Sequence, residues 1–176
     1  MVIPQSVTTI SNAIFQNCFS LTSIVIPQGV TSIGDNAFSY CYSLTSVAIP
    51  QSVTSIGKYA FQNCVALKNI VIPQGVARLS YSVFNYCYSL TSVVIPKSVT
   101  SIDYAAFGSC YNIIKYDFTQ STRVPSASYT NMFNGINERC KIYVPDSLYN
   151  SWIAWNVWST YADYIYKASE MEVSNG

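Results

Sequence analysis

The sequence predicts a β-rich solenoid of stacked 23-residue units, closed by a C-terminal helical cap. Three columns of residues recur with that spacing and without insertions, so the units are expected to fold alike and to stack. The columns are proline at Pro4, Pro27, Pro50, Pro73 and Pro96, phenylalanine at Phe15, Phe38, Phe61, Phe84 and Phe107, and cysteine at Cys18, Cys41, Cys64, Cys87 and Cys110.

The unit at 44–66 shows the expected path of one rung. Val47 and Ile49 face the same way in a short strand, which Pro50 ends because proline has no N–H for a ladder. A second short inward segment follows, and residues 60–64 are predicted to return the chain in a tight helical or 3-10 turn. One unit cannot bury these side chains alone. Six rungs about 4.8 Å apart would bury them in a solenoid roughly 30 Å long.

The repeat phase also predicts how the chain is divided. Four full units occupy 21–43, 44–66, 67–89 and 90–112, and the phase loosens from Ile113. Phe133 is interpreted as a displaced copy of the phenylalanine column, and a last strand at 141–145 closes the series. We therefore expect an array of about six rungs over 1–140, the last one irregular. Residues 141–176 form a closing strand, a Trp-rich helical cap and a loose tail after Lys167.

The cap is predicted from helical spacing after Pro145. Asp146 or Ser147 is the expected N-cap. The apolar positions that follow are Leu148, Trp152 and Trp155, with Trp158, Tyr161 and Ile165 extending the apolar surface. Because a solenoid's open end exposes its last core layer, a covering role is favoured. An aromatic sugar-binding or membrane-interface site is the alternative, and few basic residues support the membrane version.

The five column cysteines are predicted to be packed free thiols, since their side chains point side by side into the core. Cys140 lies outside the column, and a bridge to Cys110 across the irregular loop stays open. No CxxC spacing exists, which argues against zinc and redox motifs.

Composition excludes several classes of function. Half of the residues are apolar, only 10% are charged, the net charge is +1, and histidine is absent. The commonest general base and metal ligand are therefore missing, and no basic face could neutralise phosphates. We expect no enzyme activity, no cofactor, no metal and no nucleic acid. No apolar run is long enough to insert this part in a membrane, no signal peptide is visible, and the chain is expected to be a piece of a longer protein.

Two surface features are candidate binding sites. Outward strand positions form a polar column, Ser23, Ser46, Asn69 and Ser92, beside Val25, Ala48, Val71 and Val94. The residues after the column cysteines are Phe19, Tyr42, Val65, Tyr88 and Tyr111, and Tyr40 and Tyr86 join the same edge. Exposed rings with hydroxyl neighbours suit sugar stacking or a Tyr-rich protein contact. The alternatives are that the strand residues are simply what a solvent-facing strand tolerates, and that the rings only pack on one another.

The repeated pattern LxxIxIPxxVxxIxxxAFxxCxx over residues 1–112 resembles the BspA-like class of leucine-rich repeats. Ile14, Ser80 and Val83 depart from its commonest residues. Residues 140–168 also resemble the closing segment of bacterial members. The resemblance implies a leucine-rich-repeat solenoid and a recognition or adhesion scaffold on a cell surface or in a secreted protein.

We therefore expect a non-catalytic, extracellular or cell-surface module that binds a protein or glycan on another cell surface. A receptor-binding module of a phage tail or extracellular fibre and a purely structural spacer are the alternatives. No feature indicates the ligand's identity or the oligomeric state.

Overall fold

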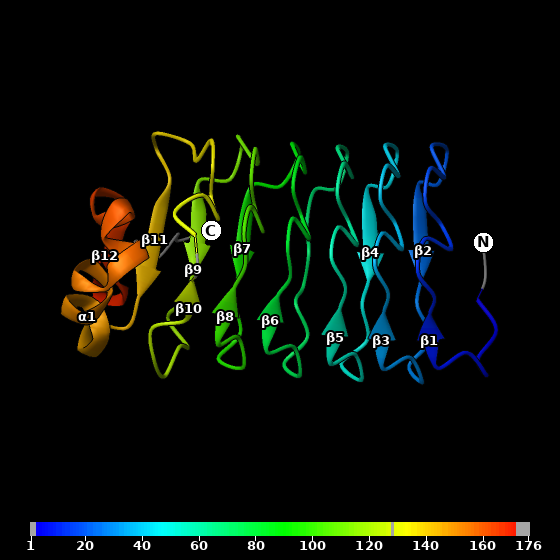
Figure 1. Cartoon of the computed structure of the whole chain (residues 1–176), viewed down its shortest axis with the longest axis horizontal. Helices are drawn as coiled ribbons and strands as arrows, with labels where there is room; N and C mark the ends of the chain where they lie inside the picture. The colour runs from blue at the N-terminus through cyan, green and yellow to red at the C-terminus, as the bar shows by residue number, and fades with distance from the viewer. Residues whose placement is uncertain (1–2, 128, 172–176) are drawn as a thin grey trace.

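Each 23-residue unit forms one rung of a solenoid in the computed structural model, which describes residues 3–127 and 129–171. The rungs stand side by side along the long axis, with the cap at one end (Figure 1). The strands are β1 (Thr9–Ile10), β2 (Ser23–Val25), β3 (Ser32–Ile33), β4 (Ser46–Ala48), β5 (Ser55–Ile56), β6 (Arg78–Leu79), β7 (Ser92–Val94), β8 (Ser101–Ile102), β9 (Lys115–Asp117), β10 (Ser126–Ala127), β11 (Lys141–Val144) and β12 (Ile165–Lys167). The helices are α1 (Tyr149–Ala154) and the 3-10 helices η1 (Asp146–Leu148), η2 (Asn156–Tyr164) and η3 (Ala168–Glu170).

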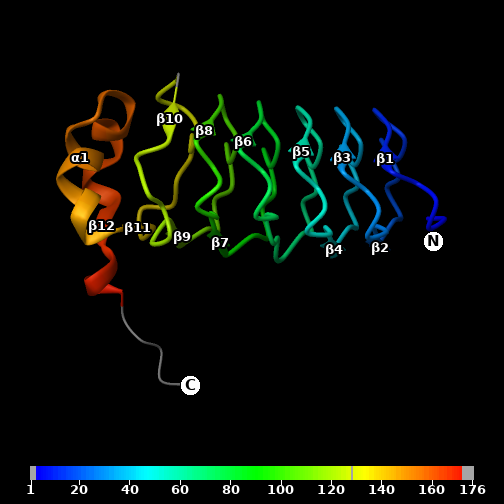
Figure 2. The ribbon, with the colours of Figure 1, turned by 90° about the horizontal axis from the view of Figure 1, so that it is seen from below.

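The strands line two sides of the solenoid, and every pairing is parallel. One side holds the sheets β1-β3-β5 and β10-β8-β6, and the other holds β2-β4 and β12-β11-β9-β7. Figure 2 shows the two rows from below. Partners in the regular rungs are 23 residues apart, as in Ser23 with Ser46 and Ser32 with Ser55. The in-phase stacking expected from the repeat is confirmed.

The third side is built from turns, where the sequence predicts a helical or 3-10 turn. Alternate residues donate to the next rung, as in Phe38 N–H to Ala60 O at 2.8 Å. Those between them close turns within their own rung, as in Cys41 N–H to Phe38 O at 3.2 Å. This alternation needs left-handed residues at two points of each rung, such as Asn36 (φ 57°) and Tyr40 (φ 62°). A helix cannot contain them, which explains the difference.

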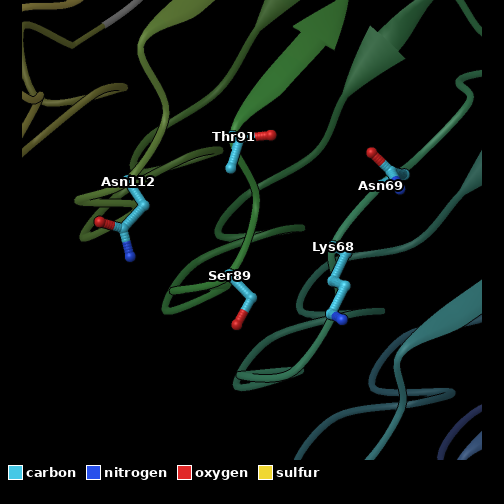
Figure 3. Close-up of a pocket in the computed structure, with 5 residues that line it drawn as sticks. All are labelled: Lys68, Asn69, Ser89, Thr91 and Asn112. Atoms are coloured by element: carbon cyan, nitrogen blue, oxygen red, sulfur yellow. The ribbon is translucent and has the colours of Figure 1, made fainter.

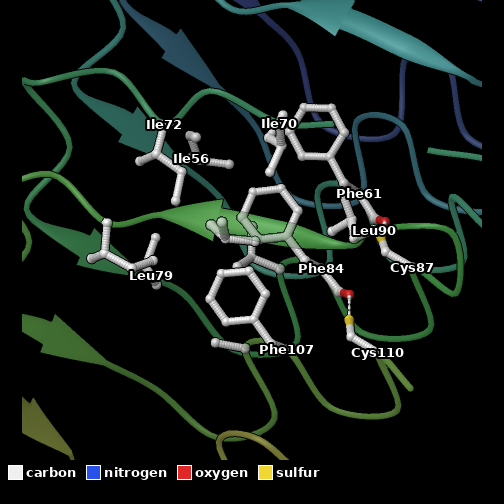
Figure 4. Packing of buried hydrophobic residues seen from close by; sticks show 14 of the residues in the cluster. Ile56, Phe61, Ile70, Ile72, Leu79, Phe84, Cys87, Leu90, Phe107 and Cys110 are labelled. Atoms are coloured by element: carbon white, nitrogen blue, oxygen red, sulfur yellow. Dashed lines mark hydrogen bonds between the residues drawn. The ribbon is translucent and has the colours of Figure 1, made fainter. Parts of the chain in front are cut away.

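The columns fill the core. Phe38 and Phe61 stack with ring centroids 5.2 Å apart, and Phe61 and Phe84 with centroids 5.6 Å apart. Figure 4 shows the phenylalanine column beside Cys87 and Cys110. All six cysteines are free thiols, so Cys110 and Cys140 are not bridged. The expected displaced copy is also present, since Phe133 stacks on Phe107 at 6.1 Å.

Strand pairing is interrupted on both sides near the middle of the array. No strand forms at 69–71, and β5 and β6 belong to different sheets. At the position of Gly57, whose N–H donates to Ile33 O at 2.8 Å, the next rung has Ser80. The Ser80 hydroxyl instead donates to Ile56 O at 2.6 Å, so the side chain takes the acceptor that the backbone would use.

The cap differs from the predicted helix in three ways. No side chain caps η1 or α1, and the Asp146 carboxylate instead accepts the Ser169 N–H at 3.0 Å. α1 ends before Trp155, which is extended and exposed, so Trp152 and Trp158 cover the last rung. Because η2 turns the chain back towards the sheet, residues 165–167 form a strand instead of a helix face.

The tail is not loose directly after Lys167, because η3 forms there and Ser169 is tied to Asp146. Residues 172–176 lie outside the described residues. The division of the chain at residue 140 stays a prediction.

Candidate functional site

The aromatic residues after the column cysteines form one exposed edge, here called the aromatic rim. Its rings expose between 38% and 53% of their surface, so they are available to a ligand. The rim consists of Phe19, Tyr42, Tyr88 and Tyr111, with Tyr40 and Tyr86 half-buried behind them.

The rim rings stack in two pairs. Phe19 and Tyr42 have centroids 5.3 Å apart, and Tyr88 and Tyr111 have centroids 5.7 Å apart. Tyr40 meets the Tyr42 ring edge-on at 6.1 Å, and Tyr86 meets Tyr88 in the same way. Ring faces inside a pair are therefore occupied, as the packing alternative expects. The exposed surface of the rim therefore comes from the parts of the rings outside these contacts.

Val65 separates the two pairs. It occupies the rim position in the unit between Tyr42 and Tyr88, and Asn63 occupies the position of Tyr40 and Tyr86. Two rungs of about 4.8 Å put the flanking rings about 10 Å apart. Because Val65 has no ring, the row of rim rings has a gap of one rung between Tyr42 and Tyr88.

The polar strand column is only partly brought together. Ser23 and Ser46 are partners in the β2–β4 pair and are exposed, while Ser92 is half-buried and pairs with Lys115. Asn69 is exposed but lies outside any strand. The column is therefore a continuous polar row only over its first two members.

A shallow polar depression of about 580 Å³ lies where the pairing is interrupted. Its lining comes from three successive rungs, and Lys68, Ser89 and Asn112 project in the same direction (Figure 3). Thr91 and Asn69 complete it. The depression adjoins the rim, since the Ser89 N–H donates to Val65 O at 3.1 Å and the Asn112 amide donates to Tyr88 O at 2.7 Å.

A second row of tyrosines was missed by the sequence reasoning. Tyr81 and Tyr104 stack at 4.8 Å, Tyr59 lies 5.3 Å from Tyr81, and Tyr129 meets Tyr104 edge-on at 5.5 Å. The 23-residue separation of Tyr81 and Tyr104 could have revealed it. Its rings expose less surface than the rim, apart from Tyr129.

Charge contributes little to these surfaces. Within residues 3–127 and 129–171, Arg78 and Asp103 form the one ion pair, at 3.8 Å. Partial desolvation, with the neighbouring Tyr111 and Tyr86, raises the pKa of the Tyr88 phenol, which therefore stays a neutral donor and acceptor. No group of three or more potential metal ligands occurs in the described part of the chain. No helix there has the length and hydropathy needed to cross a membrane.

Parallel strands in stacked, near-identical rungs define the class as a leucine-rich repeat protein. The chain belongs to the BspA type leucine rich repeat family, whose model matches six copies over residues 1–114. Proteins of this family are typically binding modules without enzyme activity, and membership indicates a repeat-based binding or recognition module.

Solved structures show the same fold. A leucine-rich repeat protein of T. pallidum is 26% identical with a TM-score of 0.64, over 86% of this chain and 80% of that one. A leucine rich cell surface protein from Faecalibacterium prausnitzii A2-165 is 33% identical with a TM-score of 0.63. The match covers 73% of this chain but only 34% of that protein. No curated protein sequence matches the chain significantly.

Proposed function

We propose that the chain is a non-catalytic recognition module of a cell-surface or secreted protein, binding a protein or glycan through its neutral, Tyr/Ser/Thr-rich repeat surface. Membership of the BspA type family and the likeness to a protein described as a cell surface protein support the location. The low charge and the exposed rim support a contact made by stacking and hydrogen bonds.

One coincidence carries the proposal. The rim is interrupted at Val65, the strand row is interrupted at 69–71, and the polar depression lies beside both. If this surface only packed one rung on the next, each rung would be expected to have similar residues here. Here several columns change together, and the result is a gap between two ring pairs next to hydroxyl and amide groups.

The chemistry of this region suits a ligand that spans rungs. Each ring contributes about 0.5–1.5 kcal/mol beyond its buried area, so one contact is weak and several are needed. A polymeric glycan or an extended protein segment would meet Tyr42, Val65 and Tyr88 in turn. Lys68 is the one charged group in the depression, so binding should change little with ionic strength.

The test is binding of the chain to glycan and protein arrays. Replacing Tyr42, Tyr88 and Tyr111 by Ser should remove binding while the fold persists, because these side chains lie outside the core. The matched control replaces Tyr59, Tyr104 and Tyr129 by Ser in the second tyrosine row, and it should bind normally. Full binding by the rim variant, or strong salt dependence, would contradict the proposal. Failure of the unaltered chain to bind any array would favour a structural spacer.

A further inference from the structure

The cap carries an exposed tryptophan next to a pocket. Trp155 exposes 55% of its surface, whereas Trp152 and Trp158 are fully buried. A pocket of about 380 Å³ opens beside it, between α1 and the loop that precedes β10. Its lining is mainly apolar, with Leu148 and the Trp155 ring, and also includes Arg123. None of the lining residues belongs to the aromatic rim, so the rim does not explain this pocket.

Both walls of this pocket are fixed by hydrogen bonds. Trp155 ends α1 in an extended conformation, and its carbonyl oxygen accepts the N–H of Trp158 at 2.8 Å and of Ser159 at 3.2 Å. On the other wall the buried Trp158 indole N–H donates to Pro125 O at 2.8 Å, and the Ser126 N–H donates to Thr100 O at 2.9 Å. These bonds hold the backbone of both walls in place, so the backbone loses little conformational entropy when a ligand binds.

The positive charge of Arg123 favours a negatively charged ligand in this pocket. Arg123 is the one charged residue in the lining, and no carboxylate of the described residues pairs with it within 4 Å. A guanidinium presents a planar fork of donors that matches a carboxylate. Thr122 and Ser151 are exposed and place two hydroxyls in the same lining, while the third hydroxyl there, that of Ser126, donates to Thr100 O at 3.1 Å.

We propose that this pocket binds an acidic sugar, a pyranose ring that carries a carboxylate. The apolar face of the ring stacks on Trp155, the carboxylate binds Arg123, and the sugar hydroxyls bond to Thr122 and Ser151. A volume of about 380 Å³ falls in the range of small-ligand pockets and accommodates one sugar unit. A peptide carboxylate shares the charge but offers no polyhydroxylated ring for the two hydroxyl side chains.

The probe is glucuronate, titrated into the full chain while tryptophan fluorescence is recorded. Trp155 is the one exposed tryptophan, so the signal should change and saturate, with a dissociation constant on the order of 1 mM for a single sugar unit. Glucose lacks the charge and acetate lacks the ring. Each should bind at least about tenfold more weakly, since a hydrogen bond to a charged group and a ring stack are each lost separately.

Variants assign the two contacts. Arg123→Gln should abolish the preference for glucuronate over glucose. Trp155→Ala lacks the reporter ring, so its binding is followed by titration calorimetry, and it should bind neither sugar. Arg139→Gln is the matched control, because Arg139 is also exposed but lies near Tyr111, outside the pocket. All three variants should keep the unfolding midpoint of the unaltered chain.

Four outcomes would overturn the proposal: equal binding of glucose and glucuronate, an unchanged preference in Arg123→Gln, no saturable signal with glucuronate, or tighter binding of the dipeptide Gly-Leu. The rim variant of the preceding section should still bind glucuronate, so failure of one proposal is distinguishable from failure of the other.

Discussion

The thiol of Cys64 donates a hydrogen bond of 3.2 Å to the carbonyl oxygen of Phe38 in the preceding rung. The same bond joins Cys41 to Phe15, Cys87 to Phe61 and Cys110 to Phe84, each across 26 residues. Two of these bonds appear in Figure 4. Cysteine therefore both fills core volume and gives a second donor to a buried carbonyl, which neither alanine nor valine could do.

We predict that the buried thiols resist alkylation in the folded protein. Cys41, Cys64 and Cys87 are fully buried, and burial raises the pKa of the Cys41 thiol to about 11. At pH 8 a thiol with that pKa is only about 0.1% ionised, and the thiolate is the nucleophile. Mass spectrometry after iodoacetamide treatment should show these three unlabelled until urea unfolds the chain. The half-buried Cys18 should be labelled first. Rapid labelling of all three in the native state would contradict their place in the core.

We predict that stability falls as the pH rises above 9. Burial raises the pKa of the Cys41 thiol to about 11 and that of Cys110 and Cys140 to about 12, from an ordinary value near 9. A raised pKa favours the protonated folded state, so this contribution is complete below pH 9 and is lost between pH 9 and 12. Each thiol adds a slope of up to about 1.4 kcal/mol per pH unit. Urea titrations from pH 7 to 11 should show it, and Cys41→Ala should have a shallower slope. Equal slopes would contradict the assignment.

The repeat columns allowed the solenoid to be predicted from sequence, because a 23-residue phase held in three residue types fixes which side chains stack. The prediction also holds for Phe133, which belongs to the phenylalanine column although it does not follow the 23-residue spacing. The turn side was harder. A left-handed residue at Tyr40 has no sequence signal of its own, because glycine or asparagine would be expected there.

The candidate sites show the same limit. The rim was predicted from the position of Tyr42 and Tyr88, whereas the stacking in pairs depends on side-chain packing across rungs. The break between β5 and β6 coincides with Ser80, whose hydroxyl takes the Ile56 carbonyl, and the repeat columns do not predict it. Trp155 was assigned to the buried face because helical spacing assumes an unbroken helix, and the chain leaves the helix at that residue.

We predict that Phe61→Ala destabilises the protein by about 3–5 kcal/mol, the usual cost of removing a buried phenylalanine. Phe61 is fully buried and stacked on both sides, so its removal leaves a cavity between Phe38 and Phe84. The urea unfolding midpoint measures the loss. Phe19→Ala is the control, since Phe19 is exposed and contacts one ring, and it should cost about 1 kcal/mol or less. An unchanged midpoint in Phe61→Ala would disprove the stacked core.

We predict that Ala13→Gly stabilises the protein by about 0.5–1 kcal/mol. Ala13 is exposed and has φ 55°. Its N–H donates a hydrogen bond of 2.9 Å to Asp35 O in the next rung. An L-residue in the left-handed region costs about 1–2 kcal/mol, which exceeds the entropy that glycine loses on folding. Ala48→Gly, in the exposed part of strand β4, should instead destabilise by about 0.5–1 kcal/mol. Equal shifts of the two unfolding midpoints would contradict the inference that the positive φ of Ala13 destabilises the protein.

The last prediction separates the two tryptophans that helical spacing assigned to one face. Trp158→Ala should cost about 3–5 kcal/mol, because its buried ring lies 4.3 Å from Trp152 and its indole N–H holds Pro125 O. Trp155→Ala should stay within about 0.5 kcal/mol of the unaltered protein, because the side chain is exposed.

Removing the whole cap extends the same argument. A chain that ends before Asp146 loses the cover of Phe118, which packs edge-on against Trp152 at 4.9 Å, and leaves β11 as an uncovered edge strand next to bare apolar surface. Such a surface favours association, so size-exclusion chromatography should show aggregates and a hydrophobic dye should bind. Trp155→Ala serves as the control and should remain in the same elution volume as the full chain. A soluble truncation with an unchanged unfolding midpoint would mean that residues 146–171 are an appendage whose purpose is binding, and that the last rung is stable without them.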